Sequence, residues 1–164
     1  MFIKNAIYLI LFYSAVCNGQ TTAFDAMIDS TLQKTVSFIT SDNLLYNYED
    51  YTILDSREIN EYNVSHLKNA IHVGYEHFNM DKTIKKLSLK TPVIVYCSVG
   101  YRSEKIAEKL IKKGYKVYNL YGGIFEWKNK KNMVIDTSNT ETNKVHCYNE
   151  NWSKWLVNGE KIYD

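Results

Sequence analysis

The chain has 164 residues, of which 45% are hydrophobic, with 20 basic against 18 acidic side chains and a formal net charge of +2. This length is enough for one domain with a substantial core, and it argues against two full domains. The near balance of charge, without a block of lysine or arginine, argues against a nucleic-acid-binding face and favours small anions or proteins as partners.

Residues 1–19 differ from the rest of the chain. Lys4 precedes the apolar stretch 6–16, and small residues follow up to Gly19, which is typical of a secretory signal peptide. The stretch is shorter than the roughly 20 apolar residues of a membrane-spanning helix, and this disfavours a retained anchor. Cys17 also permits a bacterial lipoprotein. We therefore expect an exported protein, periplasmic or secreted, with a lipid anchor through Cys17 as the alternative and no membrane span in the mature chain.

Residues 20–35 are expected to form an N-terminal helix or a loosely packed arm, because Phe24, Ile28 and Leu32 recur at every fourth position. From residue 36 to residue 135, short β-branched or aromatic runs alternate with helical patterns, which is typical of a parallel sheet covered by helices. The predicted strands are 36–39, 51–54, 70–73, 93–96 and 116–120. The sequence therefore predicts an α/β domain over residues 36–135.

The most regular helical pattern follows residue 103. Its apolar residues at helical spacing are Ile106, Ala107, Leu110 and Ile111. The charged side chains of the segment fall mostly on other faces, and Glu104 near the start suits the helix macrodipole. Gly114 is placed to end the helix in a left-handed cap.

Residues 136–164 form a C-terminal extension. The polar connector 136–143 leads into a stretch that contains Trp152 and Trp155, and this aromatic content argues against disorder. We expect the extension to pack back onto the domain, with partner binding as the alternative. Cys147 is expected to be a small buried residue, with a role as a resolving thiol as the alternative.

The heptapeptide from Cys97 to Ser103 lies between an apolar run predicted as a buried strand and the helical pattern. Such a loop turns at Gly100, and the helix that follows directs its free backbone N–H groups back into the loop. Those amides and the neighbouring Arg102 favour the thiolate, which is the reactive form of cysteine. We therefore expect an anion-binding thiol site rather than a cysteine that merely ends a core strand. The loop residues are Cys97, Ser98, Val99, Gly100, Tyr101, Arg102 and Ser103.

Three separated segments make residues 36–135 resemble the single-domain form of the rhodanese family. The first is similar to the family's stretch from an aspartate-x-arginine to a histidine and an alanine-isoleucine strand; it comprises Leu54–Glu58, Glu61–Tyr62, His66–Leu67 and Ala70–His72. The other two are Cys97–Ser103 and Gly122–Trp127. Where the family usually has glycines before the histidine and before the alanine, this chain has Ser65 and Asn69. Asparagine tolerates the left-handed backbone that such a glycine adopts.

The resemblance implies a five-stranded parallel sheet with helices on both faces and the cysteine at the carboxyl end of a central strand, where open α/β sheets hold their ligands. It also implies a sulfurtransferase in which Cys97 takes sulfane sulfur from a small anion such as thiosulfate, becomes a persulfide and passes the sulfur to cyanide, a thiol or a protein. Backbone N–H groups from Ser98 to Ser103 would surround the terminal sulfur. Arg102 would bind donor anions or fix the loop through a carboxylate. No metal and no organic cofactor is implied.

Two alternatives stay open. A phosphatase or an arsenate-reductase-like enzyme would use the same loop, but tyrosine phosphatases and the rhodanese-like dual-specificity phosphatases place a longer spacer between cysteine and arginine than the four residues found here. A non-catalytic rhodanese-like protein-binding module is the second alternative. The presence of Cys97 argues against it, because such modules have often lost their cysteine.

Other polar residues are expected to support the framework. Asp55 and Arg57 are predicted to form an ion pair that ties neighbouring loops, with anion binding by Arg57 as the alternative. His66 and His72 are predicted to be hydrogen-bonded framework residues, because two histidines without cysteine or carboxylate partners at ligand spacing make a poor metal site. Trp127 is predicted to be a packing residue.

Overall fold

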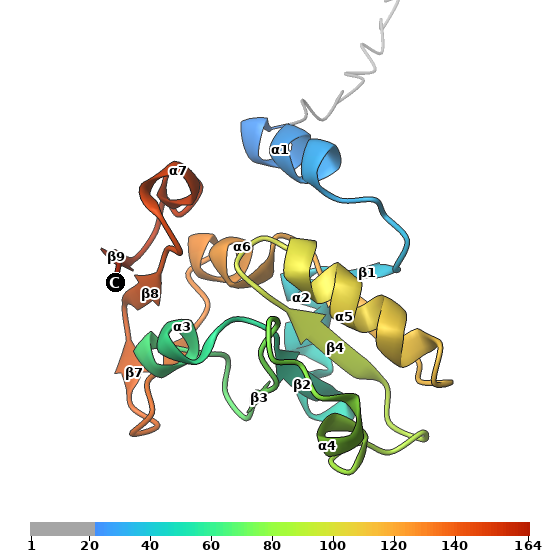
Figure 1. The fold of residues 1–164 in the computed structure, drawn as a ribbon. Helices are drawn as coiled ribbons and strands as arrows, with labels where there is room; N and C mark the ends of the chain where they lie inside the picture. The colour runs from blue at the N-terminus through green and yellow to red at the C-terminus, as the bar shows by residue number, and fades with distance from the viewer. Residues whose placement is uncertain (1–21) are drawn as a thin grey trace, which may run out of the picture.

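The computed structural model describes residues 22–164 (Figure 1). The expected signal sequence, residues 1–19 with Cys17, lies outside the described residues. Among residues 22–164, none of the helices has the length and hydropathy that a membrane crossing requires.

Five parallel strands form the central sheet. They are β1 (Phe38–Ile39), β2 (Thr52–Asp55), β3 (Ile71–His72), β4 (Val93–Tyr96) and β5 (Val117–Leu120). Their order across the sheet is β1-β5-β4-β2-β3, and all neighbours run parallel. This topology confirms the predicted α/β class, and it places β4 in the centre, so that the residue after β4 emerges at the middle of the sheet's carboxyl edge.

Helices cover both faces of the sheet (Figure 1). Successive side chains of β4 alternate between the faces: Val93 and Val95 belong to one apolar cluster, and Ile94 and Tyr96 belong to the other. The first face is covered by α4 (Met80–Ile84) and α5 (Tyr101–Ile111). The second is covered by α2 (Ser41–Tyr46), η1 (Tyr48–Asp50), α3 (Ile59–Val64) and α6 (Gly123–Asn129).

Helix α5 forms where the sequence predicts it, but two of its residues lie differently. Ile106, Ala107 and Leu110 are buried as expected, whereas Ile111, the last residue of the helix, is 42% exposed. Glu104 is wholly buried, because its carboxylate accepts hydrogen bonds from the backbone N–H groups of Gln33 and Thr35. A buried carboxylate with such partners holds the incoming N-terminal segment against the first turn of α5.

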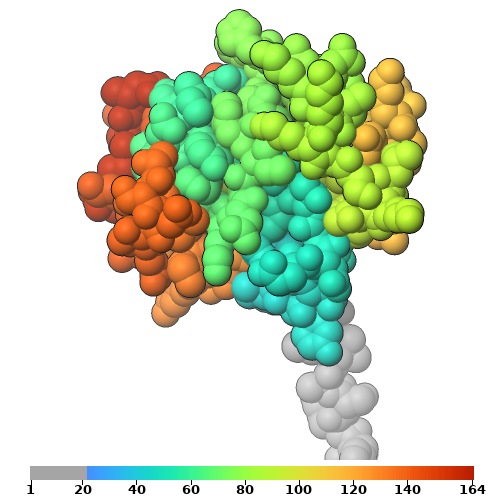
Figure 2. Space-filling model, turned by 90° about the horizontal axis from the view of Figure 1, so that it is seen from below, coloured from blue at the N-terminus to red at the C-terminus, as the bar shows by residue number. Residues whose placement is uncertain are grey.

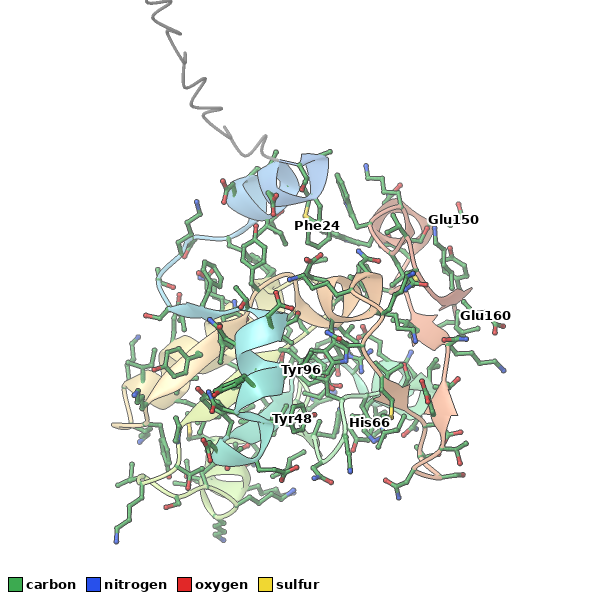
Figure 3. All side chains as sticks on the ribbon, turned by 180° about the vertical axis from the view of Figure 1, so that it is seen from behind. Phe24, Tyr48, His66, Tyr96, Glu150 and Glu160 are labelled. Atoms are coloured by element: carbon green, nitrogen blue, oxygen red, sulfur yellow. The ribbon has the colours of Figure 1, made fainter. Side chains whose placement is uncertain are left out.

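The N-terminal segment contains a helix, α1 (Ala23–Thr31), which begins with a capping box formed by Thr22 and Asp25. Ile28 and Leu32 are buried in the cluster on the second face of the sheet. The ring of Phe24 packs edge to face against Trp155 at 6.1 Å between centroids, and Figure 3 shows Phe24 between α1 and the C-terminal part of the chain. This segment is therefore a packed helix rather than a loose arm.

The C-terminal extension packs back onto the domain. It contains β7 (Glu141–Thr142), β8 (Lys144–His146), α7 (Glu150–Ser153) and β9 (Glu160–Ile162). Strand β7 pairs with β6 (Val134–Ile135), the last strand before the extension. Val145, Cys147 and Leu156 join the apolar cluster on the second face. Figure 2 shows the extension, in orange and red, beside the segment around α3, where Asn60 donates a hydrogen bond to Asp164. The extension thus adds a wall to the carboxyl edge of the sheet.

Candidate functional site

Cys97 is the first residue after the central strand β4, and it is 1% exposed. The chain turns at Gly100, whose φ is +120°, and α5 begins at Tyr101. The backbone N–H of Gly100 donates a hydrogen bond to Cys97 Sγ at 3.2 Å. The first N–H groups of an α-helix have no acceptor within the helix, so the first turn of α5 begins beside the sulfur with unsatisfied donors. The predicted amide environment of the sulfur is present at Gly100 and stays a prediction for the other loop amides.

Ser103 and Asn119 fasten the far side of the loop. Asn119 Nδ2 donates to the carbonyl of Gly100 at 2.9 Å, and the hydroxyl of Ser103 lies 2.7 Å from Asn119 Oδ1 and 3.5 Å from Cys97 Sγ. Because this hydroxyl carries one proton, it serves one acceptor at a time. Asn119 is a buried polar residue in strand β5; sequence reasoning missed it, although an asparagine inside an apolar strand run was the available signal.

The first turn of helix α6 donates hydrogen bonds to the backbone of the loop, and a glycine at its start allows this close contact. The N–H of Ile124 donates to the carbonyl of Cys97 at 2.9 Å, and that of Phe125 donates to the carbonyl of Ser98 at 3.1 Å. Gly123 has a φ of +56°, and a Cβ at this position would lie 2.3 Å from the Cys97 carbonyl oxygen. Only glycine therefore allows α6 to approach this closely.

Arg102 fixes the loop through a carboxylate, as one of its two predicted roles requires. Its Nη1 and Nη2 donate to the two oxygens of Glu61 at 2.5 and 2.7 Å, and Nη2 also donates to Ser98 Oγ at 3.0 Å. Burial acts to raise the pKa of Glu61, but the hydrogen bonds and charge of Arg102 outweigh it and hold that pKa below its usual value. The charge of Arg102 is thus neutralised inside the protein. Glu61 is a partner that sequence reasoning did not identify.

Asp55 and Arg57 form the predicted ion pair, at 2.6 Å and with both side chains fully buried. Arg57 also donates to the carbonyl of Ser65, and Asp55 accepts from the hydroxyl of Tyr96, an interior residue in Figure 3. Burial, together with the charge of Asp55, raises the pKa of Tyr96 well above its usual value. The pair belongs to the framework under the loop: Arg57 lies outside the pocket over Cys97, so the alternative of anion binding by Arg57 does not fit this geometry.

The predicted surroundings of His66, His72, Trp127 and Asn69 are confirmed. His66 contacts the carbonyl of Tyr62 through Nδ1, and His72 contacts the carbonyl of Arg57 through Nε2. Trp127 is buried and donates to the carbonyl of Met133. Asn69 has the left-handed backbone expected of it, with a φ of +59°. Among the described residues, no group of three His, Cys, Asp or Glu side chains is arranged to hold a metal ion.

The two described cysteines, Cys97 and Cys147, are free thiols. Cys147 lies in the apolar cluster, where burial raises the pKa of its thiol. It does not line the pocket over Cys97. This environment agrees with the expectation of a small buried residue and gives no support to a resolving thiol.

A pocket of about 220 Å³ lies over Cys97. Its wall includes Tyr148 and Trp152 of the C-terminal extension, and the guanidinium of Arg102 lies 5.2 Å from the centre of the Tyr148 ring. The other lining residues are Glu58, Tyr75, Glu76, Ser98, Val99, Tyr101 and Arg102. Sequence reasoning placed the extension on the domain but did not place it at the pocket. The arrangement gives a recessed thiol with an amide donor, opening into a small aromatic chamber.

Comparisons with known proteins identify the family of this domain. A family model described as a rhodanese-like domain matches residues 40–130. The chain is 34% identical over 85 residues to a thiosulfate sulfurtransferase of Coxiella burnetii, covering 51% of this chain and 78% of that protein. It is 40% identical over 87 residues to a tRNA uridine(34) hydroxylase of Pelagibacter ubique, covering 52% of this chain but only 29% of that protein.

Solved structures give the same fold. A rhodanese-related protein from Thermoplasma volcanium is similar with a TM-score of 0.55 and 27% identity, covering 60% of this chain and 97% of that one. A thiosulfate sulfurtransferase from Pseudomonas aeruginosa is similar with a TM-score of 0.57 and 20% identity, covering 67% of this chain and 22% of that one. At the latter identity the likeness concerns the fold alone.

Proposed function

The chain belongs to the rhodanese-like domain family, and from this premise we propose that it is a sulfurtransferase that carries sulfane sulfur as a persulfide on Cys97. The observation that carries the proposal is the hydrogen bond from the Gly100 amide to Cys97 Sγ, at the start of α5 and at the carboxyl end of the central strand. A backbone N–H so placed can donate to the attacking sulfur of Cys97 and, after loading, to the persulfide.

The proposed reaction has two steps, and each conserves charge. In the first, the Cys97 thiolate attacks the outer sulfur of a donor such as thiosulfate; the new S–S bond forms on Cys97, and sulfite leaves with the electron pair of the broken bond. In the second, a thiolate or cyanide attacks the outer sulfur of the persulfide, and the Cys97 thiolate leaves. No metal and no organic cofactor is needed for either step.

The engagement of Arg102 favours sulfur transfer over phosphate chemistry. A phosphatase needs its arginine fork to hold the phosphoryl oxygens, whereas here both terminal nitrogens of Arg102 bind Glu61. The curated sulfurtransferase relative supports the same assignment, although the hydroxylase relative shows that the domain also occurs in proteins with another activity.

A paired assay tests the proposal. The protein is supplied with thiosulfate and cyanide while thiocyanate is measured, and in parallel with a phosphate ester while released phosphate is measured. We expect thiocyanate formation that is lost in Cys97→Ser, and no phosphate release. Phosphate release that depends on Cys97, or thiocyanate formation that survives the substitution, would overturn the proposal; a cellular role that survives Cys97→Ser would instead support a binding module.

We propose further that the protein is exported, on the sequence pattern of residues 1–19. Fractionation of cells that produce the full chain, followed by mass determination of its N-terminus, tests this. A mature chain that begins after Gly19 in the exported fraction is expected; a lipid-modified Cys17 would support the anchored form, and an intact N-terminus in the cytoplasm would contradict export.

A further inference from the structure

The pocket over Cys97 combines acidic and aromatic side chains, and its one cation is already neutralised. On this basis, and resting on the proposed function, we propose that the sulfur acceptor is a small thiol that carries a cationic amine. The residues that would select it are the carboxylates Glu58 and Glu76 and the aromatic side chains Tyr148 and Trp152, which line the pocket together with Cys97. Tyr148 and Trp152 lie beyond residues 40–130, the span of the matched family model.

The charge of the pocket favours a cationic acceptor. Arg102 is the one cationic side chain among the residues that line the pocket, and both of its terminal nitrogens donate to Glu61. Glu58 and Glu76 have no such cationic partner among the ion pairs of residues 22–164. Glu58 is held in place because its carboxylate accepts the backbone N–H of Glu76 at 3.1 Å. An incoming ammonium group therefore meets net negative charge, whereas an anion, whether a carboxylate on an acceptor or the thiosulfate donor itself, meets a repulsion that salt screens.

The aromatic side chains of the pocket also favour a cationic acceptor. Tyr75, Tyr101, Tyr148 and Trp152 all line the pocket. Aromatic faces attract ammonium and guanidinium groups through their quadrupole, and the Tyr148 ring already receives the guanidinium of Arg102 at 5.2 Å. Beside the Tyr148 ring, which is already in contact with Arg102, the lining thus offers three further aromatic side chains to a cationic group.

The size of the pocket favours a small acceptor. Its volume of about 220 Å³ is below the roughly 300–1,000 Å³ of pockets for drug-sized ligands. Cys97 is buried at its base, so the acceptor must enter far enough for its sulfur to meet the outer sulfur of the persulfide. A free thiol of a few heavy atoms can enter a space of this size as a whole, whereas a cysteine on a docked protein would have to reach the buried sulfur with a side chain of only two heavy atoms.

The proposed transfer to the acceptor is a single thiol–persulfide exchange. The thiolate of the acceptor attacks the outer sulfur of the Cys97 persulfide, an S–S bond forms between them, and the bond to Cys97 breaks with its electron pair remaining on the Cys97 sulfur. The products are the acceptor persulfide and the Cys97 thiolate, with no net oxidation or reduction. Charge selection acts only on the approach of the acceptor, and the chemistry is the same for every thiol.

The test uses the full chain, which is loaded with sulfur from a polysulfide donor. Loading is measured by intact mass before any acceptor is added. Three probes of similar size are then compared: cysteamine, which is cationic, 2-mercaptoethanol, which is neutral, and thioglycolate, which is anionic. Rates are compared at equal thiolate concentration, and each is divided by the rate of the same probe with a small neutral disulfide in solution, because the ionised fraction and the intrinsic nucleophilicity both vary with the pKa of the thiol. We expect unloading by cysteamine to be about tenfold faster than by thioglycolate at low salt, and the ratio to shrink as ionic strength rises.

Variants locate the selectivity. Glu76→Gln and Trp152→Leu should each reduce the ratio of cysteamine to thioglycolate rates about threefold, whereas Glu141→Gln, an exposed change on β7, should leave it unchanged. The ratio is measured within one protein sample, so it does not depend on the folded fraction. Tyr148→Phe, which keeps the aromatic face, should preserve the ratio, and Tyr148→Leu should lower it.

The outcomes separate the two proposals. A chain that never loads sulfur overturns the proposed function and this inference with it. A chain that loads sulfur but unloads equally fast to all three probes overturns this inference alone. Faster unloading to a lysine-rich peptide that contains one cysteine than to cysteamine also overturns it, in favour of a protein acceptor.

Discussion

Arg102 and Glu61 form a two-point ion pair in which Nη1 and Nη2 of the arginine donate to the two carboxylate oxygens at 2.5 and 2.7 Å. The glutamate is almost fully buried, and the arginine is 14% exposed. The pair joins the first turn of α5 to α3, and through Ser98 it reaches the residue next to Cys97. It therefore supports the geometry of the loop and removes a free cation from the pocket.

Replacing Glu61 by glutamine should destabilise the protein by about 2–3 kcal/mol, because a buried arginine loses its counter-charge. Urea unfolding at neutral pH measures the effect. Glu141→Gln, at an exposed position on β7, is the matched control and should change the free energy of unfolding by less than about 0.5 kcal/mol. Equal stability of the two variants would show that the pair contributes nothing.

The same pair should make stability depend on pH. The pKa of Glu61 is lower in the folded protein than its usual value, which is about 4.3 in an unfolded chain. The stabilisation is therefore complete above that pH and is lost as the pH falls through the folded-state pKa. In urea titrations, the difference between wild type and Glu61→Gln should shrink on acidification below about pH 4.3. A difference that stays constant down to the acid limit would refute this linkage.

Gly123→Ala should disturb the cysteine loop, because the added methyl group would collide with the loop backbone. A Cβ there would meet the carbonyl oxygens of Cys97 and Ser98 at 2.3 and 2.7 Å, at a φ of +56°. We expect a loss of about 3 kcal/mol or more in stability and about a 100-fold slower sulfur transfer, because the nucleophile moves.

Gly114→Ala is the matched control for this change, since Gly114 also has a positive φ but no atom within 4 Å of an added Cβ. It should cost about 1–2 kcal/mol and leave transfer by the folded protein unchanged. If both alanine variants behaved alike, the close approach of α6 to the loop would not be what requires glycine.

Tyr96→Phe tests the buried polar cluster behind the loop. The Tyr96 hydroxyl donates to Asp55 at 2.5 Å and accepts from the N–H of Leu67 at 3.1 Å, so its removal leaves a buried donor and a buried carboxylate each short of a partner. We expect a loss of about 1–3 kcal/mol by thermal or urea unfolding. Tyr46→Phe, at a tyrosine that is 88% exposed, should be neutral; a neutral Tyr96→Phe would mean that water replaces the hydroxyl.

Local sequence patterns were sufficient for the strand segments of a parallel sheet, for α5 and for the loop, whereas the central place of β4 was implied by the resemblance to the rhodanese family. Periodic apolar residues predict β4 and the buried face of α5, and the glycine and arginine near Cys97 predict a loop between them. The pairing of Glu61 with Arg102, the bond from Asn119 to Gly100 and the burial of Glu104 were not predictable, because they join segments far apart in the chain. The position of Tyr148 and Trp152 at the pocket depends on how the extension packs, which no local pattern specifies.

Peptide mass spectrometry of the protein after treatment with thiosulfate tests most directly whether Cys97 carries sulfur. We predict the gain of one sulfur atom on the peptide that contains Cys97, its removal by cyanide, and its absence in Cys97→Ala. A sulfur adduct on Cys147 instead, or no adduct on a folded chain with either thiosulfate or a polysulfide as donor, would contradict the account.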